Sequence, residues 1–196
     1  MKPKVPAVPI LVVAVLCAIL AAFPAQAQPA CVTFEPPLAL GTTYGAPVGQ
    51  TPGTLAFVSN GIPVRLYNFR LITGPFIFNR AYIDNAPYPF SAGQSIRSNN
   101  INLLFDFTSL PFPVSRVRLS YLDLGGYENL SVNGSAFHVG ELTAAPATLG
   151  GVSVSVSSAP LPPPFGGKTG MVVLKGGVKS LMIGGQELWL DQVCAD

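Results

Sequence analysis

Two cysteines lie at the two ends of the chain that would remain after export, and they constrain the fold more than any other feature. Cys17 falls within residues 1–27, which resemble a secretion signal, so the exported chain keeps only Cys31 and Cys194. In an oxidising compartment these two cysteines are expected to pair with each other. Their Cα atoms should then lie about 4.4–6.8 Å apart. Such a bond would place the first and last strands side by side.

The first 27 residues have the three parts of a signal peptide. Lys2 and Lys4 supply the positive start, residues 10–22 the apolar stretch, and residues 25–27 a small-x-small cleavage site. The apolar stretch is too short for a membrane-spanning helix, and nothing later approaches about 18 uninterrupted apolar residues. The sequence therefore predicts a secreted or periplasmic protein with no transmembrane segment after signal cleavage.

The exported chain, residues 28–196, has the length of one domain. Charged residues make up 10% of the sequence, well below the roughly 25% of an ordinary soluble domain. Without Lys2 and Lys4 the basic and acidic residues balance, and no basic patch indicates a nucleic-acid partner.

Strand patterns dominate the exported chain, and helix patterns are nearly missing. In residues 115–122, Val117, Leu119 and Tyr121 alternate with Arg116, Arg118 and Ser120, which predicts one buried and one solvated face. Further strands are expected at 31–35, 64–71, 76–83, 101–107, 152–157, 171–174, 178–183 and 187–193. Asn-Gly and Gly-Gly pairs between them favour tight hairpins. These patterns predict an all-β fold, an antiparallel β-sandwich or jelly roll. The Pro- and Gly-rich stretches 36–54 and 158–170 are expected to be loops.

Catalytic and zinc sites have little support in the residue types. His138 is the only histidine, whereas zinc needs three or four His, Cys or acidic ligands. No G-x-S-x-G sequence accompanies His138. Two of the nine acidic residues could form a glycosidase pair, but most of them sit beside turns, where capping explains them.

Two short end motifs, Phe34-Glu35 and Leu190-Asp191, resemble those of the galactose-binding-like jelly rolls, which are secreted carbohydrate-binding sandwiches. The resemblance implies a structural calcium ion held by Glu35 and Asp191 with backbone oxygens. If Cys31 lies directly opposite Cys194, Glu35 falls opposite Leu190, and the two carboxylates point to different faces. A bulge or an offset disulfide would be needed to bring them together.

A second resemblance covers most of the exported chain. The block Asp123–Gly134, the Cys-x-x-Phe-Glu start and the Gly-Gly-Gln-Glu-Leu-Trp-type end are similar to uncharacterised secreted bacterial β-sandwich proteins. This resemblance implies export and a β-fold, and no particular activity.

Aromatic and polar side chains alternate along residues 67–97, as in many sugar sites, where rings face sugars and polar groups bind hydroxyls. We expect most phenylalanines here, and Trp189, to be buried. The candidate ligand-binding residues are Asn79, Arg80, Tyr82, Asp84, Asn85, Tyr88 and Arg97.

The first functional hypothesis is a secreted, non-enzymatic binding module with an extracellular glycan as its ligand. The alternatives are a structural or surface-assembly protein that packs through low-charge faces, and a glycosidase or lyase. The last would require two carboxylates that converge on a cleft.

Overall fold

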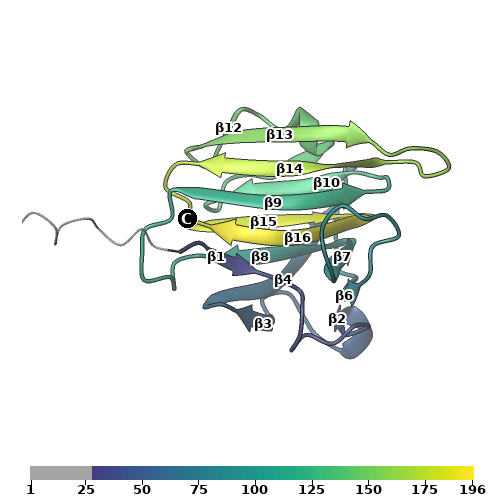
Figure 1. Cartoon of the computed structure of the whole chain (residues 1–196), viewed down its shortest axis with the longest axis horizontal. Coiled ribbons are helices and arrows are strands. Elements are labelled where there is room, and N and C mark those ends of the chain that lie inside the picture. Colours follow the sequence, from purple (N-terminus) through teal and green to yellow (C-terminus); the bar gives the residue numbers. More distant parts are fainter. Residues whose placement is uncertain (1–27) are drawn as a thin grey trace, which may run out of the picture.

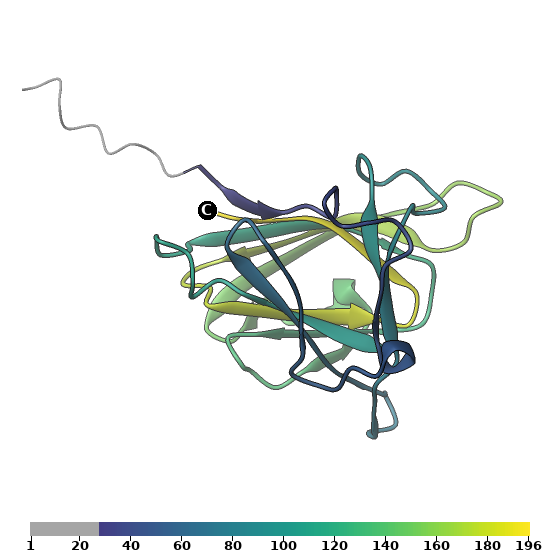
Figure 2. The ribbon, with the colours of Figure 1, turned by 90° about the horizontal axis from the view of Figure 1, so that it is seen from below.

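The computed structural model describes residues 28–196, and the predicted signal peptide lies outside the described residues. The described chain forms two antiparallel sheets, one of nine strands and one of seven, that pack face to face (Figures 1 and 2). The expected all-β sandwich is thus confirmed. Among these residues, no helix has the length and apolar character needed to cross a membrane.

Sheet A holds the nine strands, in an order that brings the two ends of the chain together. Its order is β12 (Thr148–Leu149), β13 (Val152–Pro160), β14 (Lys168–Lys175), β9 (Arg116–Asp123), β16 (Leu188–Ala195), β7 (Ser95–Asn99), β6 (Arg80–Asp84) and β2 (Thr43–Gly45), with β1 (Ala30–Val32) also paired to β16.

Sheet B holds the seven strands and faces sheet A across the core. Its order is β11 (His138–Gly140), β10 (Glu128–Val132), β15 (Ser180–Gly185), β8 (Ile101–Asp106), β4 (Ile62–Arg70) and β3 (Leu55–Ser59), with β5 (Phe76–Ile77) paired to β4. Two single-turn 3₁₀ helices, η1 (Ala46–Val48) and η2 (Leu142–Ala144), lie in the connections.

The core lies between the sheets and is filled by alternate residues of the strands. In β9, Val117, Leu119 and Tyr121 are at most 1% exposed, while Arg116 and Arg118 are exposed. This confirms the predicted alternation. Leucine, isoleucine and phenylalanine side chains of β4, β8 and β15 fill the facing side of the core.

The predicted disulfide joins Cys31 of β1 to Cys194 of β16, and the two residues are directly opposed in the antiparallel pair. Their Cα atoms are 4.0 Å apart, slightly closer than the expected range. The short separation accompanies the lack of any offset between the two cysteines along their strands.

β16 contains an irregularity that changes which side chains share a face. Its register against β9 shifts between Asp191 and Cys194, and Gln192 has a positive φ of 51°. An extra residue in the left-handed region is the signature of a β-bulge, which re-aims the neighbouring side chains. This is the bulge that Glu35 and Asp191 need in order to converge.

Three predicted segments differ from the structure. The expected loop at 158–170 is shorter, because β13 runs to Pro160 and β14 begins at Lys168. Residues 76–83 form two strands, because β5 pairs with β4 of sheet B whereas β6 pairs with β7 of sheet A. The chain crosses between the sheets at Phe78 and Asn79. The expected loop at 36–54 contains the short strand β2 and η1.

Candidate functional site

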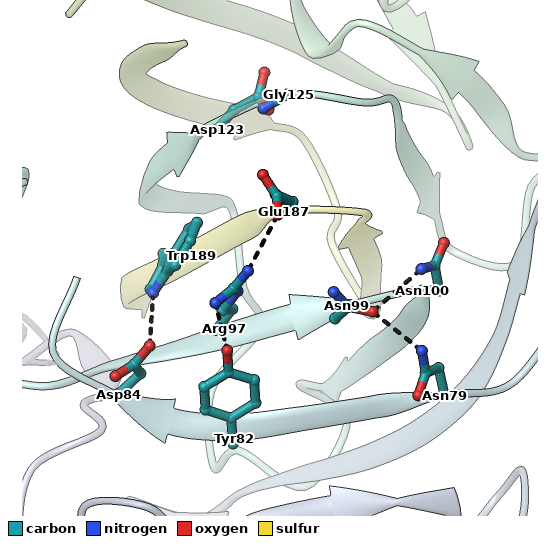
Figure 3. A network of polar contacts seen from close by, with 10 residues as sticks. All are labelled: Asn79, Tyr82, Asp84, Arg97, Asn99, Asn100, Asp123, Gly125, Glu187 and Trp189. Carbon is teal, nitrogen blue, oxygen red and sulfur yellow. Dashed lines mark hydrogen bonds and ion pairs between the residues drawn. The ribbon is translucent and has the colours of Figure 1, made fainter. Parts of the chain in front are cut away.

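The outer face of sheet A carries a row of directly opposed residues from three neighbouring strands. Tyr82 of β6 pairs with Arg97 of β7, and Arg97 pairs with Trp189 of β16. Since side chains of opposed residues lie on the same face of a sheet, all three project outward. Figure 3 shows this row with its polar neighbours.

Arg97 lies at the centre of the row and contacts residues on both sides of it through its guanidinium group. Its guanidinium carbon is 4.4 Å from the centre of the Trp189 ring and 5.5 Å from that of Tyr82. It donates to the Tyr82 hydroxyl and pairs with Glu187 at 3.3 Å. The indole N–H of Trp189 donates to Asp84 at 3.4 Å (Figure 3). Three predicted ligand-binding residues, Tyr82, Asp84 and Arg97, therefore belong to one cross-strand network.

The other predicted ligand-binding residues are more dispersed. Arg80 is exposed, with its guanidinium carbon 5.5 Å from the Tyr82 ring. The Asn79 amide donates to Asn99 at 3.1 Å, away from the indole (Figure 3). Asn85 and Tyr88 lie beyond β6, in the segment that leads to β7.

Loops cover Trp189, which is 2% exposed as expected. The expectation for the phenylalanines of residues 67–97 was wrong, because only Phe69 of the four is buried. Its ring packs with Leu122 and Leu161 beneath the segment that carries Tyr88 and Phe90. The Tyr88 ring lies 5.5 Å from that of Phe165 in the facing loop. The first hollow, of about 280 Å³, opens on this segment. It is lined by Asn85, Ala86, Tyr88, Pro89, Phe90, Ser91 and Gly93.

A second hollow, of about 360 Å³, contains the two carboxylates of the calcium prediction. Glu35 and Asp191 both line it, together with Thr33, Ala92, Gly93 and Gln192. The bulge at Gln192 therefore turns Asp191 toward the side on which Glu35 lies. Asp191 is 2% exposed, whereas Glu35 is half-buried.

Hydrogen bonds hold both carboxylates in place. The Asp191 carboxylate accepts a hydrogen bond from the Ser91 hydroxyl and another, at 2.7 Å, from the backbone N–H of Gln192. The Glu35 carboxylate accepts a hydrogen bond from the backbone N–H of Gln94 at 2.7 Å. Burial raises the pKa of Asp191 above its ordinary value, and the nearby charge of Glu35 adds to this rise, whereas the two donors to Asp191 oppose it.

A third hollow, of about 250 Å³, continues along the same face. It is lined by Arg118, Leu119, Ser120, Met171, Gln192 and Cys194. The first and second hollows share Gly93, and the second and third share Gln192. The three hollows therefore adjoin one another in a row, which we call the sheet A hollows.

A separate polar group lies between the two sheets, at one end of the core. Asp123 ends β9, Glu128 begins β10, and Glu141 precedes η2. One carboxylate oxygen from each of the three lies within 4.8 Å of the other two. Asp123 and Glu128 are 5% and 1% exposed. Asp123 accepts from the Gly125 amide at 2.8 Å, and Lys168 bonds to Glu141. We call these three residues the acidic cluster.

Burial raises the pKa values of two carboxyl groups of the acidic cluster. Desolvation, reinforced by the charges of Asp123 and Glu141, raises the pKa of Glu128 to about 8. Burial also raises the pKa of Asp123, against the stabilising Gly125 amide. The pKa of Lys168 rises because its ammonium is hydrogen-bonded to Glu141.

Sequence reasoning missed the acidic cluster, although one signal for it was present. Asp123 continues the period-two series of Val117, Leu119 and Tyr121, so the alternation of β9 already directs it into the core. His138 lies beside the cluster, where its Nε2 is 2.9 Å from the backbone oxygen of Glu141.

Comparison of the chain with protein-family models, with curated proteins and with solved structures finds no significant match.

Proposed function

We propose that the protein is an exported, non-enzymatic binding module that holds a glycan along the sheet A hollows. The observation that carries this proposal is that the three hollows adjoin. Each measures 250–360 Å³, near the lower end of the roughly 300–1,000 Å³ that is usual for small-molecule sites. An extended ligand that occupies several hollows suits this surface better than one compact molecule.

The lining groups suit the hydroxyls and ring faces of a sugar. The carboxylates of Glu35 and Asp191 can accept hydrogen bonds from hydroxyls, while Arg118 and Gln192 can donate them. Tyr88 offers a ring face in the first hollow. The signal peptide pattern supports an encounter with such a ligand in the periplasm or outside the cell.

A structural calcium ion between Glu35 and Asp191 is the second part of the proposal. Both carboxylates border one hollow, and Asp191 is almost fully buried. Calcium takes six to eight oxygen ligands, so these two side chains would need backbone, water or ligand oxygens to complete the site. The donor set fits a hard cation in kind and leaves part of its coordination sphere to other groups.

The same pair of carboxylates supports glycoside hydrolysis as an alternative, because a glycosidase needs two carboxyl groups on one cleft. The acidic cluster is a poorer candidate, since Asp123 and Glu128 are too buried to reach a substrate.

Self-association is favoured by a different observation. β3 is an edge strand of sheet B, and its Leu55 and Val58 are 42% and 56% exposed. Exposed apolar edge strands are templates for pairing with another chain. Sedimentation over a range of concentrations would detect such assembly, and a monomer at high concentration would count against it.

The test of the glycan proposal is retention of the purified protein on a panel of immobilised and soluble polysaccharides. We expect reversible retention on at least one of them, with no release of reducing ends. Release of reducing ends would replace the binding proposal with the glycosidase alternative. Failure to be retained on any polysaccharide would remove the glycan proposal.

A further inference from the structure

The acidic cluster links parts of the fold that are otherwise separate. Asp123 lies on the inner face of sheet A and Glu128 on the inner face of sheet B, while Glu141 reaches them from the segment before η2. Strand alternation directs the first two inward, since Asp123 follows Tyr121 and Glu128 precedes Leu130 on the core-facing side. Carboxylates from both layers thus meet at one end of the core.

Glu128 provides a second and independent observation. It is 1% exposed, and within residues 28–196 no donor is in hydrogen-bond geometry with either of its carboxylate oxygens. The backbone N–H of Leu142 is near enough to stabilise the Glu128 carboxylate, although it does not form a hydrogen bond of good geometry with it. A buried carboxylate without a partner is strongly unfavourable unless a proton or a cation neutralises it.

We infer that the acidic cluster binds a hard divalent cation, calcium, that braces sheet A against sheet B. Three carboxylates can supply up to six oxygens, and oxygen-only sites favour calcium or magnesium over zinc. Calcium–oxygen bonds of 2.3–2.6 Å let two ligands of one ion lie up to about 4.6–5.2 Å apart. One carboxylate oxygen from each residue of the acidic cluster lies within 4.8 Å of the other two, a spacing within that span.

Lys168 competes with the cation for Glu141 and lies on the route by which the ion would enter. Lys168 and Glu141 face the solvent beside Asp123 and Glu128, with side chains 37% and 48% exposed. A bound ion would take over the Glu141 carboxylate, and the ammonium would turn out to solvent. Removing the Lys168 charge should therefore tighten cation binding.

This site is distinct from the proposed calcium position at Glu35 and Asp191. Asp123 pairs with Leu188 at the start of β16, whereas the bulge follows Asp191, farther along the strand. Variants of Glu35 and of Glu128 consequently separate the two positions.

The experiment uses the exported protein with its disulfide intact, stripped of metal by a chelator. Calorimetric titration with calcium chloride and thermal melting should show calcium binding and a rise in Tm. Glu128→Gln should remove one binding event, while Glu35→Gln leaves this one in place. Lys168→Met should lower the calcium Kd several-fold. Asp106 ends β8, outside the acidic cluster, and its carboxylate accepts a hydrogen bond from the backbone N–H of Thr108. Asp106→Asn is therefore the matched control and should leave calcium binding unchanged.

Glu141→Gln is the second variant, since Glu141 is exposed and its change should not prevent folding; it should weaken calcium binding at least tenfold. The inference is overturned if the stripped protein binds no calcium, or if the Glu128→Gln and Glu141→Gln proteins bind it as the unmodified protein does. A magnesium response equal to that of calcium would overturn the assignment of the ion. If the acidic cluster bound no cation, Glu128 would instead hold a proton and share it with Asp123. Calcium would then have no effect on Tm through this site, which would also overturn the inference.

Discussion

The guanidinium carbon of Arg97 lies 4.4 Å from the centre of the Trp189 ring, on a strand pair that places the two residues directly opposite each other. Cation–π contacts of this kind contribute about 0.5–2 kcal/mol, the larger values applying to sites shielded from water. Because loops cover Trp189, the contact belongs to the shielded class.

Arg97→Met keeps the aliphatic stem and removes the charge, the contact with the ring and the hydrogen bond to Tyr82. We expect the free energy of unfolding to fall by about 1–3 kcal/mol, and the emission of Trp189, the only tryptophan, to change. Arg80→Met is the control, since Arg80 is exposed and contacts only Tyr82 among these rings; its effect should be within about 0.5 kcal/mol. Equal effects of the two variants in urea unfolding would contradict the assigned role of Arg97.

The disulfide closes almost the whole of residues 28–196, with a sequence separation of 163 residues between Cys31 and Cys194. In the chain-entropy model, a loop of this length stabilises the folded state by about 4–5 kcal/mol. The Cys31→Ala/Cys194→Ala double variant should lose about that much in urea unfolding. Two free thiols in exported protein, or an unchanged unfolding midpoint, would refute the pairing.

Leu119 and Arg118 are neighbours on β9 that face opposite sides of sheet A. Leu119→Ala should lower the free energy of unfolding by about 2–5 kcal/mol, because it leaves a cavity in the core. Arg118→Ala should change it by less than about 0.5 kcal/mol, because the side chain is exposed. Small and equal effects would mean that the two faces of β9 are assigned wrongly.

The strand pattern of β9 was readable from the sequence because period two maps directly onto two faces. The bulge in β16 could not be predicted from the sequence, because the residue with positive φ is Gln192 and not a glycine or an asparagine, the residues that usually adopt it. The pairing register of β6, β7 and β16 could not be predicted from the sequence either. That register is what places Arg97 between Tyr82 and Trp189. Asp123 illustrates a third limit: it caps Gly125, as an acid beside a turn should, and also faces the core.

The proposed calcium position at Glu35 is best measured in a Glu128→Gln background, which removes the acidic cluster from the comparison. A chelator should lower the Tm of that protein, and added calcium should restore it, because a ligand that binds only the folded state stabilises it by mass action. A further change, Glu35→Gln, should abolish the response. Melting curves that are identical with and without chelator would leave Glu35 and Asp191 as hydrogen-bonded carboxylates without a cation.

The most direct test of the glycan proposal compares two arginine variants on whichever polysaccharide retains the protein. Arg118 lines the third of the sheet A hollows, whereas Arg70 is exposed on β4 of sheet B. Arg118→Ala should raise the Kd about tenfold, equivalent to about 1.4 kcal/mol of binding free energy, with little loss of folding stability. Arg70→Ala should leave the Kd unchanged. An unchanged Kd for Arg118→Ala, or an equal loss for Arg70→Ala, would contradict the placement of the ligand on sheet A.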